Sequence, residues 1–454
     1  MALLTKAPRG TQDVTPKDSA KWQALERILD ETAAHYGYRE IRTPVFEHTE
    51  LFQRSVGETT DVVQKEMYTF ADKGGRSITL RPEGTAGAAR AMLEHALYND
   101  GLPVKVCYKT ACYRYEKPQA GRLREFHQFG VECFGAADPS ADAEIICLAH
   151  AVFETLGVTG INLEINSIGC PTCRAKYHQA LRDYFSNRAD ELCETCRSRL
   201  ERNPMRILDC KSPICSAIAA DAPIMLDYLC DDCRTHFEQV QAYLTAAGLT
   251  YTVNPTIVRG LDYYTRTVFE FVSTQIGAQG TVCGGGRYDG LIDELGGAHT
   301  PSLGFGMGLE RLLLLLETEG ITLPEPEPCD LYIAGLGRRA QLEGFALTQK
   351  ARAEGFAVEC DIVGRSLKAQ MKYADKIGAR FTMVLGDNEL DTGKARLKNM
   401  ATGEQREIDL SELISCLYDV RFSAALDGIT EMGGSSGDVA AFLKKMTDSE
   451  ADQK

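Results

Sequence analysis

The chain has 454 residues, of which 44% are hydrophobic and 25% are charged, and its formal net charge is −14. This length exceeds one ordinary core and predicts two to four domains of a globular protein. The negative charge argues against nucleic-acid binding driven by whole-protein charge, although local basic patches can still hold a polynucleotide. The N-terminus lacks an apolar run typical of a signal peptide, and the aliphatic run at 312–316 is too short to span a bilayer, so we expect a cytoplasmic protein without membrane contact.

The N-terminal residues predict a helix, a broken strand and a strand-to-helix junction. Apolar residues recur on one face of residues 17–36, as in an amphipathic helix. The segment YREIRTPVFEH, which follows Gly37, reads as a strand that Pro44 interrupts, and proline there indicates an edge or a bend. In RSITLRPEGTAGAAR (76–90), the polar sequence Glu-Gly-Thr stands where a strand gives way to a helix, so its side chains can face a cleft.

Residues 108–135 predict a basic hairpin. Hydrophobic and polar residues alternate in CYKTACYRYE and again in FHQFGVECFG, as in half-buried strands, and the intervening KPQAGRLRE has the composition of a cationic loop. The floor of this hairpin would carry Arg114, Glu116, Gln128 and Glu132. A planar guanidinium beside carboxylates and an amide suits a substrate that has both a phosphate and an amine.

A later segment, VRGLDYYTRTVFEF (258–271), places Arg259 close to Tyr263 and Tyr264. A buried cation beside two tyrosines is costly without an anion. Either an anionic ligand or a structural pair with Asp262 would supply that anion.

Two glycine-rich segments follow. The three consecutive glycines of TVCGGGRYDGLI (281–292) bring the backbone close to a ligand or to another strand, and alone they indicate only a turn. PSLGFGMGLERLLLLLE (301–317) reads as a strand that leads into a buried helix. Arg311 in the first turns of that helix must emerge at a site, unless Glu310 or a similar carboxylate caps it.

Residues 169–240 predict a helical insertion that is rich in cysteine. Its eight thiols form four pairs of short spacing, Cys170/Cys173, Cys193/Cys196, Cys210/Cys215 and Cys230/Cys233. Such pairs can share tetrahedral ions, so eight thiolates fit two structural zinc sites of undetermined grouping. The alternative is eight reduced cysteines on helices that fold without metal. A zinc ion with four thiolates has no open position and would not be catalytic.

The segment 323–329 is rich in proline and glutamate and predicts a linker. Beyond it, three apolar runs of strand length alternate with helical segments, which predicts a parallel α/β domain at 330–420. Lys368, Lys372, Lys376 and Arg380 recur every four residues as a cationic stripe, which is either a solvated face or a polynucleotide contact. Residues 421–454 predict a mobile tail.

These segments, in this order, resemble motifs 1, 2 and 3 of class II aminoacyl-tRNA synthetases, and VRGLDYYT resembles the histidine-binding motif of histidyl-tRNA synthetases. The resemblance covers nearly all of residues 6–420. It implies an α+β fold, an antiparallel sheet flanked by helices, with catalytic parts at 1–168 and 241–322, the helical insertion, and a C-terminal anticodon-binding domain. It also implies a homodimer, with L-histidine, ATP with Mg²⁺ and tRNA(His) as partners.

The resemblance further implies roles for particular residues. The histidine-binding set would be Glu83, Gly84, Thr85, Arg114, Gln128, Glu132, Arg259, Tyr263 and Tyr264. The ATP-binding set would be Arg114, Glu116, Phe126 and Arg311, and the catalytic groups would be Arg259, Arg114 and Arg311. Candidate tRNA contacts are Lys117, Gln119, Lys372 and Lys376.

Two other functions share parts of this pattern. The regulatory subunit of ATP phosphoribosyltransferase shares the catalytic fold, but the arginines at 114, 259 and 311 and the complete C-terminal domain argue against it. Another class II synthetase, such as a prolyl or threonyl enzyme, would not carry VRGLDYYT.

Overall fold

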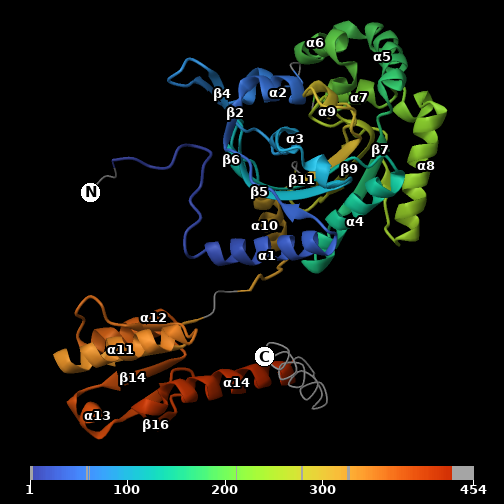
Figure 1. Ribbon diagram of the computed structural model, residues 1–454. Helices are drawn as coiled ribbons and strands as arrows, with labels where there is room; N and C mark the ends of the chain where they lie inside the picture. The colour runs from blue at the N-terminus through green and yellow to red at the C-terminus, as the bar shows by residue number, and fades with distance from the viewer. Residues whose placement is uncertain are drawn as a thin grey trace. The chain divides into compact units, whose positions relative to one another are not determined.

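The computed structural model describes residues 4–57, 60, 62–210, 212–277, 280–324 and 328–431, with side chains to residue 422. The chain divides into two compact units, Met1–Glu325 and Pro326–Lys454 (Figure 1). Among the described residues, no helix is long and apolar enough to cross a membrane.

The first unit is built on one large sheet with the strand order β1-β5-β6-β11-β10-β9-β7-β8. Its six central strands pair antiparallel, whereas β1 pairs parallel with β5 and β8 pairs parallel with β7. The strands are β1 (Arg39–Glu40), β5 (Val104–Tyr113), β6 (Glu125–Phe134), β7 (Asn162–Ser167), β8 (Thr252–Val253), β9 (Thr265–Val272), β10 (Thr281–Arg287) and β11 (Ser302–Gly308).

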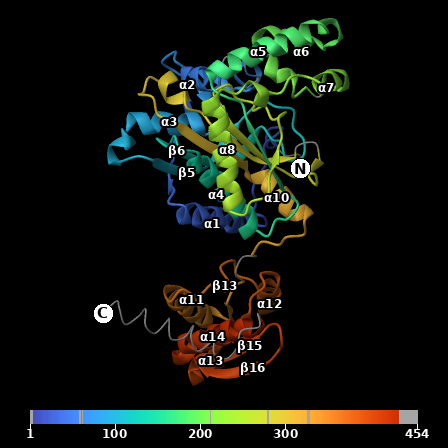
Figure 2. The same cartoon turned by 90° about the vertical axis from the view of Figure 1, so that its right-hand side faces the viewer.

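Four helices cover one face of this sheet: α1 (Ser19–His35), α4 (Pro139–Thr155), α8 (Asp231–Ala246) and α10 (Leu309–Thr318) (Figures 1 and 2). Their buried leucines, isoleucines and valines pack on Phe129, Val131, Phe269 and Phe305 of the strands in one hydrophobic core. Because side chains alternate along a strand, the residues between these core-facing residues point to the opposite face of the sheet.

The opposite face carries polar residues and glycines. On β6, Phe129, Val131 and Cys133 point into the core, so Gln128 and Glu132 point to the other side. On the neighbouring β11, Leu303, Phe305 and Met307 are in the core, and the glycines between them face away from it. The sheet therefore presents a floor where a ligand can approach the backbone.

Shorter elements surround this floor. They are α2 (Thr49–Val56), α3 (Thr85–Glu94), α9 (Leu291–Glu294) and a small sheet of β2 (Phe46–His48), β3 (Thr69–Ala71) and β4 (Ser77–Leu80). A π-helical turn, η1 (Val62–Glu66), and a 3₁₀ turn, η2 (Leu97–Asp100), complete this part of the first unit. The predicted strand at 38–48 is broken around Pro44 into β1 and β2, in line with the sequence.

The insertion is helical, as predicted. Its elements are α5 (Pro171–Ser186), η3 (Ala189–Glu191), α6 (Glu194–Arg202), η4 (Pro204–Ile207), α7 (Pro213–Ala219) and η5 (Met225–Tyr228). Helix α8 begins beside Cys230 and continues past residue 240, the boundary set from sequence. Its second half places Phe237, Val240 and Leu244 in the core of the large sheet.

The second unit is a five-stranded sheet with the order β13-β12-β14-β15-β16. Strands β12 (Leu331–Gly335), β13 (Val358–Cys360) and β14 (Phe381–Leu385) are parallel, as predicted. The prediction missed an antiparallel hairpin of β15 (Lys394–Asn399) and β16 (Gln405–Asp409). The helices are α11 (Arg338–Ala353), α12 (Leu367–Lys376), α13 (Asp387–Thr392) and α14 (Leu413–Glu431), with a 3₁₀ turn η7 (Leu410–Glu412) before α14.

The predicted fold class is confirmed: an antiparallel sheet flanked by helices, a helical insertion and an α/β C-terminal unit. Part of the segment expected as a mobile tail, residues 421–431, belongs to helix α14. Residues 432–454 lie outside the described residues.

Candidate active site

A cavity of about 610 Å³ opens above the glycine-lined floor of the large sheet. Most of the predicted histidine- and ATP-binding residues line it, namely Glu83, Thr85, Arg114, Glu116, Phe126, Gln128, Arg259, Tyr263, Tyr264 and Arg311. Gly84 and Glu132 are not among the lining residues, but Glu132 accepts a hydrogen bond from Thr85, which is. Four separate segments of the chain therefore meet at one cavity, as the resemblance implies.

Arginines gather at one end of this cavity. Arg311, at the start of α10, donates from Nε to the carbonyl of Gly121 at 3.0 Å and from Nη1 to that of Thr281 at 2.6 Å. Burial, followed by the positive charges of Arg122 and Arg114, lowers the pKa of Arg311. Cations that disfavour one another in a partly desolvated site are suited to a polyphosphate.

Arg259 lies over the middle of the floor, where it forms an ion pair with Glu270 of β9. Glu270 also accepts a hydrogen bond from Thr281 Oγ1 at 2.9 Å. The interpretation that Arg259 pairs with Asp262 is wrong, because Asp262 accepts instead from Asn203 Nδ2 at 3.2 Å. Arg259 Nε is buried without a hydrogen-bond partner among the described atoms, as expected of a donor that awaits a ligand.

Glycines of the floor leave the space that these side chains occupy. A β-carbon at position 284 would lie 2.4 Å from Arg259 Nη1, and one at 306 would lie 2.0 Å from Gln128 Nε2. A β-carbon at 304 would lie 1.8 Å from a carboxylate oxygen of Glu132. Gly284, Gly304 and Gly306 therefore leave space for side chains of the site, whereas Gly285 and Gly286 allow close approach of the neighbouring strands.

The other end of the cavity carries carboxylates and hydroxyls. Glu83 accepts the backbone N–H groups of Thr85 and Ala86 at 2.7 and 2.8 Å, so it caps the start of α3 while it lines the cavity. Glu132 is fully buried, and its carboxylate accepts hydrogen bonds from the hydroxyl groups of Thr85 at 2.7 Å, Tyr108 at 2.8 Å and Tyr288. Polar groups here can therefore position an amine and a ring nitrogen.

The substitution Glu132→Gln is expected to remove a pH-dependent loss of stability. Burial raises the pKa of Glu132 to about 8, from an ordinary 4.5, although the three hydroxyls oppose this rise. The folded state therefore keeps a proton that the unfolded chain has lost, and stability falls as the pH rises between these two values. The glutamine variant has no such proton to lose.

Urea titrations of both proteins at about pH 5 and about pH 8 measure this difference. The free energy of unfolding of the variant should rise relative to that of the wild type at the higher pH. All other titrating groups are shared by the two proteins, so an equal difference at both values would contradict a raised pKa of Glu132.

The hairpin loop closes the cavity beside Phe126. The Arg114 guanidinium lies 5.3 Å from the centre of the Phe126 ring, and its Nε donates to the carbonyl of Pro82 at 2.8 Å. Glu116 forms an ion pair with Arg122, a residue that the sequence analysis did not assign to the site. Lys117 and Gln119 are exposed on this loop, where they are free to meet a large substrate.

Glu310 does not cap Arg311. Its carboxylate accepts the N–H of His127 at 2.9 and 3.0 Å and contacts His127 Nδ1 at 2.9 Å. The hydrogen bond to Glu310 raises the pKa of His127. His127 thus serves as a neighbour that fixes Glu310 at the cavity wall.

Several residues of the site were missed by the sequence analysis. Glu270 pairs with Arg259, and Tyr108 and Tyr288 donate to Glu132, so each pair joins segments that are distant in the sequence and only the folded chain reveals it. Arg199, Arg206 and Asp209 line the cavity from the insertion. Nothing in the sequence linked the insertion to the cavity.

The cysteines of the insertion form two quartets. The first quartet joins Cys170, Cys173, Cys230 and Cys233, and the second quartet joins Cys193, Cys196, Cys210 and Cys215. Within each quartet all sulfur atoms lie within 4.8 Å of one another. Two Sγ–Sγ distances, 3.5 Å for 170/173 and 3.9 Å for 193/210, bracket the edge of about 3.8 Å that a tetrahedron of Zn–S bonds of about 2.3 Å requires.

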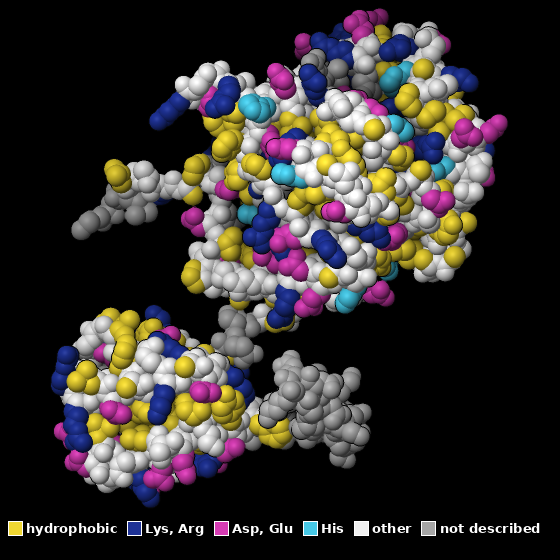
Figure 3. Space-filling model, in the orientation of Figure 1, with side chains coloured by type: hydrophobic (Ala, Val, Ile, Leu, Met, Phe, Trp, Pro, Cys, Tyr) yellow, Lys and Arg dark blue, Asp and Glu magenta, His cyan; other side chains and the backbone are white. Residues whose placement is uncertain are grey.

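In the second unit, Lys368, Lys372 and Lys376 are exposed on α12. The predicted fourth member of the stripe does not belong to it, because Arg380 follows the helix and pairs with Asp330 at 3.4 Å. On the face seen in Figure 3, acidic and basic side chains are mixed over this unit, so any polynucleotide contact must be local.

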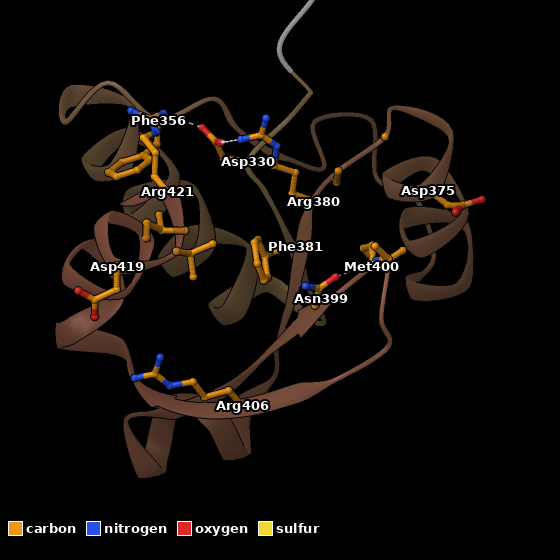
Figure 4. Close-up of a pocket in the computed structure, with 15 residues that line it drawn as sticks. Asp330, Phe356, Asp375, Arg380, Phe381, Asn399, Met400, Arg406, Asp419 and Arg421 are labelled. Atoms are coloured by element: carbon orange, nitrogen blue, oxygen red, sulfur yellow. Dashed lines mark hydrogen bonds and ion pairs between the residues drawn. The ribbon is translucent and has the colours of Figure 1, made fainter. Parts of the chain in front are cut away.

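The second unit also contains a cavity of about 630 Å³, lined by Asp330, Arg380, Arg406 and Arg421 among others (Figure 4). Asp330 binds both Arg380 and Arg421, the latter at 2.9 Å. Asp330 thus already pairs with two of these cations, and Asp375 and Asp419 also line the cavity, so the cavity does not indicate an anion site.

The first unit, with its arginine-rich cavity on an antiparallel floor, defines the catalytic unit of a class II aminoacyl-tRNA synthetase. A model of histidyl-tRNA synthetase matches residues 10–312, and a model of an anticodon binding domain matches residues 330–419. A histidine–tRNA ligase of Caldanaerobacter subterraneus subsp. tengcongensis is 58% identical over 411 residues, which are 90% of this chain and 99% of that protein. The chain belongs to the histidyl-tRNA synthetase family.

Solved structures agree with this assignment. Apo histidyl-tRNA synthetase of S. aureus has a TM-score of 0.79 and 42% identity, covering 91% of this chain and 100% of that one. A Bacillus halodurans C structure described as an ATP phosphoribosyltransferase regulatory subunit/histidyl-tRNA synthetase has a TM-score of 0.60 and 23% identity, covering 82% of this chain and 97% of that one. At that identity it shares the fold alone.

Proposed function

We propose that this chain attaches L-histidine to tRNA(His) in two steps, through a histidyl-adenylate, with release of pyrophosphate and AMP. It is an ATP-dependent ligase. The observation that carries the mechanism is the convergence of Arg114, Arg259 and Arg311, from three separate segments, on a cavity that VRGLDYYT lines. A regulatory subunit without catalysis has no need of three arginines beside one cavity.

In the first step, the histidine carboxylate attacks the α-phosphorus of ATP and pyrophosphate leaves. We assign Arg259 and Arg114 to the α-phosphate and the carboxylate, and Arg311 to the γ-phosphate. Charge develops on the α-phosphate during attack, and fixed guanidinium groups stabilise it without reorganisation. The adenine would lie beside Phe126 and Glu116.

Mg²⁺ accompanies ATP in this reaction. Carboxylates are the hard oxygen ligands that such an ion prefers, and those that line the cavity are Glu66, Glu83, Glu116, Asp209, Glu270 and Glu310. The ion would neutralise the part of the negative charge of the ATP phosphates that the arginines do not neutralise.

Histidine recognition would use both ends of the imidazole. We assign the α-amino group to Glu83, Thr85 and Gln128, and the ring to Tyr264 with Glu132 and Tyr263 behind it. Glu132 would act by accepting the imidazole N–H directly or by orienting the Thr85 hydroxyl. A site built for such hydrogen bonds rejects an amino acid that leaves its buried groups unpaired.

Pyrophosphate exchange with each of the twenty amino acids tests this function. Histidine should support exchange in the presence of ATP and Mg²⁺, and the others should not. Exchange with proline or threonine would indicate a different class II synthetase, and exchange with none of them would favour a regulatory subunit.

For tRNA, we propose that Lys117 and Gln119 meet the acceptor end and that α12 meets the anticodon side. Charge reversal of Lys372 and Lys376 to glutamate should weaken tRNA charging but leave pyrophosphate exchange unchanged. Each lost phosphate contact lowers the salt slope of binding by about one unit, so two substitutions lower it by about two at most. A KM for tRNA that is unchanged at low salt would make the stripe a solvated face.

We also propose a homodimer, whose interface includes the segment around Pro44. Val45, Phe46 and Phe70 are apolar, and 42%, 56% and 48% of their surface is exposed near the small sheet. Exposed apolar groups that gather in one region mark an interaction surface. Light scattering of the purified protein measures the mass directly.

Finally, we propose that each cysteine quartet holds a structural zinc ion. The pairing and the sulfur distances fit tetrahedral coordination. Backbone N–H groups also point at two of the sulfurs, Cys230 N to Cys173 Sγ at 3.1 Å and Cys193 N to Cys215 Sγ at 3.2 Å. Such donors stabilise thiolates.

A further inference from the structure

The loop of residues 254–264 carries Arg259, Tyr263 and Tyr264, yet it has no regular secondary structure. It joins β8 to β9, and its carbonyl groups cannot all be satisfied within the loop. Two of these carbonyl groups belong to Arg259 and Tyr264, whose side chains line the cavity. The conformation of both side chains depends on what binds these backbone groups.

Two arginines of the insertion bind them. Arg206 donates from Nη1 to the carbonyl of Arg259 at 2.9 Å, and Arg174 donates from Nη1 to the carbonyl of Tyr264 at 3.0 Å. Charge-assisted hydrogen bonds of this kind are stronger than those between neutral groups. The insertion thus holds the loop at both sides of the tyrosine pair.

Each arginine is placed by one cysteine quartet. Arg174 directly follows Cys173 of the first quartet. Arg206 lies in η4, between Cys196 and Cys210, and therefore inside the chain segment that the second quartet closes. Arg199 donates to the carbonyl of Arg206 at 3.0 Å and fixes it further.

The quartets and the loop also share a hydrophobic core. Cys173, Cys196, Cys215 and Cys233 are buried in one cluster with Tyr263 and Tyr264. Short helices and 3₁₀ turns build this part of the insertion, and helices of such length are marginal without further constraints. A metal ion in each quartet would supply the constraint.

We propose that the two metal-bound quartets, through Arg174 and Arg206, hold the loop 254–264 in the conformation that binds histidine. This inference rests on the proposed function, because it assigns to the metal centres a role at the histidine site of a synthetase. The arginines are positioning residues: both act through the backbone of the loop, and Arg206 in addition lines the wall of the cavity. Loss of metal, or of either arginine, releases the loop.

The metal is tested by elemental analysis of protein purified without added metal. Two zinc ions per chain are expected, one for each quartet. Cys196→Ser and Cys233→Ser should each lower the content to one, whereas Cys360→Ser, outside both quartets, should leave two. Iron in place of zinc, or eight thiols that react freely in the native protein, would overturn the metal part of the proposal.

We call the two hydrogen bonds from Arg174 and Arg206 to the loop 254–264 the clamp. The clamp is tested by Arg174→Met and Arg206→Met, with Arg188→Met as the matched control. Arg188 lies on the same insertion, but its partner is the exposed Glu191 at 2.9 Å. Each test variant should retain zinc and raise the KM for histidine about 10-fold in pyrophosphate exchange. Arg174→Met, whose side chain does not line the cavity, should leave the KM for ATP nearly unchanged. Amides of residues 258–264 should exchange hydrogen faster, as in zinc-depleted wild type, and Arg206→Lys should restore part of the protection.

Unchanged hydrogen exchange in the loop of either variant, with zinc retained, would overturn the clamp. An equal rise of both KM values in Arg174→Met would indicate a general structural role and would also count against it. If histidine supports no pyrophosphate exchange in the wild type, the proposed function fails. The zinc content would still show whether the quartets bind metal, and hydrogen exchange would still show whether the two arginines hold the loop.

Discussion

Arg259→Ala is expected to reduce histidine-dependent pyrophosphate exchange by about 10²-fold or more, mainly through kcat, and to leave the protein folded. The guanidinium lies in the cavity with an unpartnered Nε, so its interactions would be made with charge that forms during the reaction. Near-normal exchange by this variant would contradict the assignment of Arg259.

A second variant, Glu270→Gln, is needed because Arg259→Ala also removes the ion pair between Arg259 and Glu270. Removal of Arg259 leaves that carboxylate without its cation, although Thr281 still donates to it. Glu270→Gln keeps Arg259 and removes the pair. A loss of kcat in the alanine variant that Glu270→Gln does not reproduce would come from the guanidinium itself, and melting curves of both variants would show whether the fold is retained.

Arg287→Met is expected to lower the free energy of unfolding by about 3–5 kcal/mol, because it removes the cation of the buried Asp142 carboxylate and leaves it only the His236 ring, 3.3 Å away. Arg287 is fully buried and binds Asp142 at 2.5 Å and Asp289 at 3.1 Å. Although burial opposes ionisation, Arg287 holds the pKa of Asp142 at about 2. Asp142 is therefore charged in the folded protein at neutral pH, and its stabilising contribution is present above its unfolded pKa and lost as the pH falls toward 2.

Urea unfolding of three variants measures this effect. Asp142→Leu together with Arg287→Met should recover much of the loss, since replacement of both partners by apolar groups removes the unpaired charge. Arg188→Met, at an exposed ion pair, should cost about 0–1 kcal/mol. A loss for Arg287→Met as small as that for Arg188→Met would mean that the buried pair contributes little.

Much of the site could be predicted from the sequence because each motif is local. The alternation in residues 108–135 predicts the β5–β6 hairpin, and the side-chain period then places Gln128 and Glu132 on one face. The glycine runs indicate close approach, but only the strand register shows that Gly306 leaves space for Gln128 and Gly284 for Arg259. The roles of the site residues were implied by the family resemblance, whereas the distances between them are known only from the structure.

The remainder depends on tertiary contacts that no local pattern encodes. Four cysteine pairs can combine into two quartets in three ways, and the path of the insertion selects one of them. Glu270 belongs to an ordinary alternating strand, TVFEF, so nothing marked it as the partner of Arg259. The β15–β16 hairpin was missed because KARLKN and QREID are mostly polar. Only Ala395, Leu397 and Ile408 of these strands enter the core of the unit, which is too few apolar residues for a clear alternating pattern.

The most direct test of the account is a single-turnover reaction of the purified protein with ATP, Mg²⁺ and labelled histidine, followed by addition of tRNA(His). The account predicts a histidyl-adenylate that stays bound to the protein, forms far more slowly in Arg259→Ala, and disappears as histidyl-tRNA(His) accumulates. An adenylate that forms equally well without Arg259, or none that tRNA(His) consumes, would contradict it.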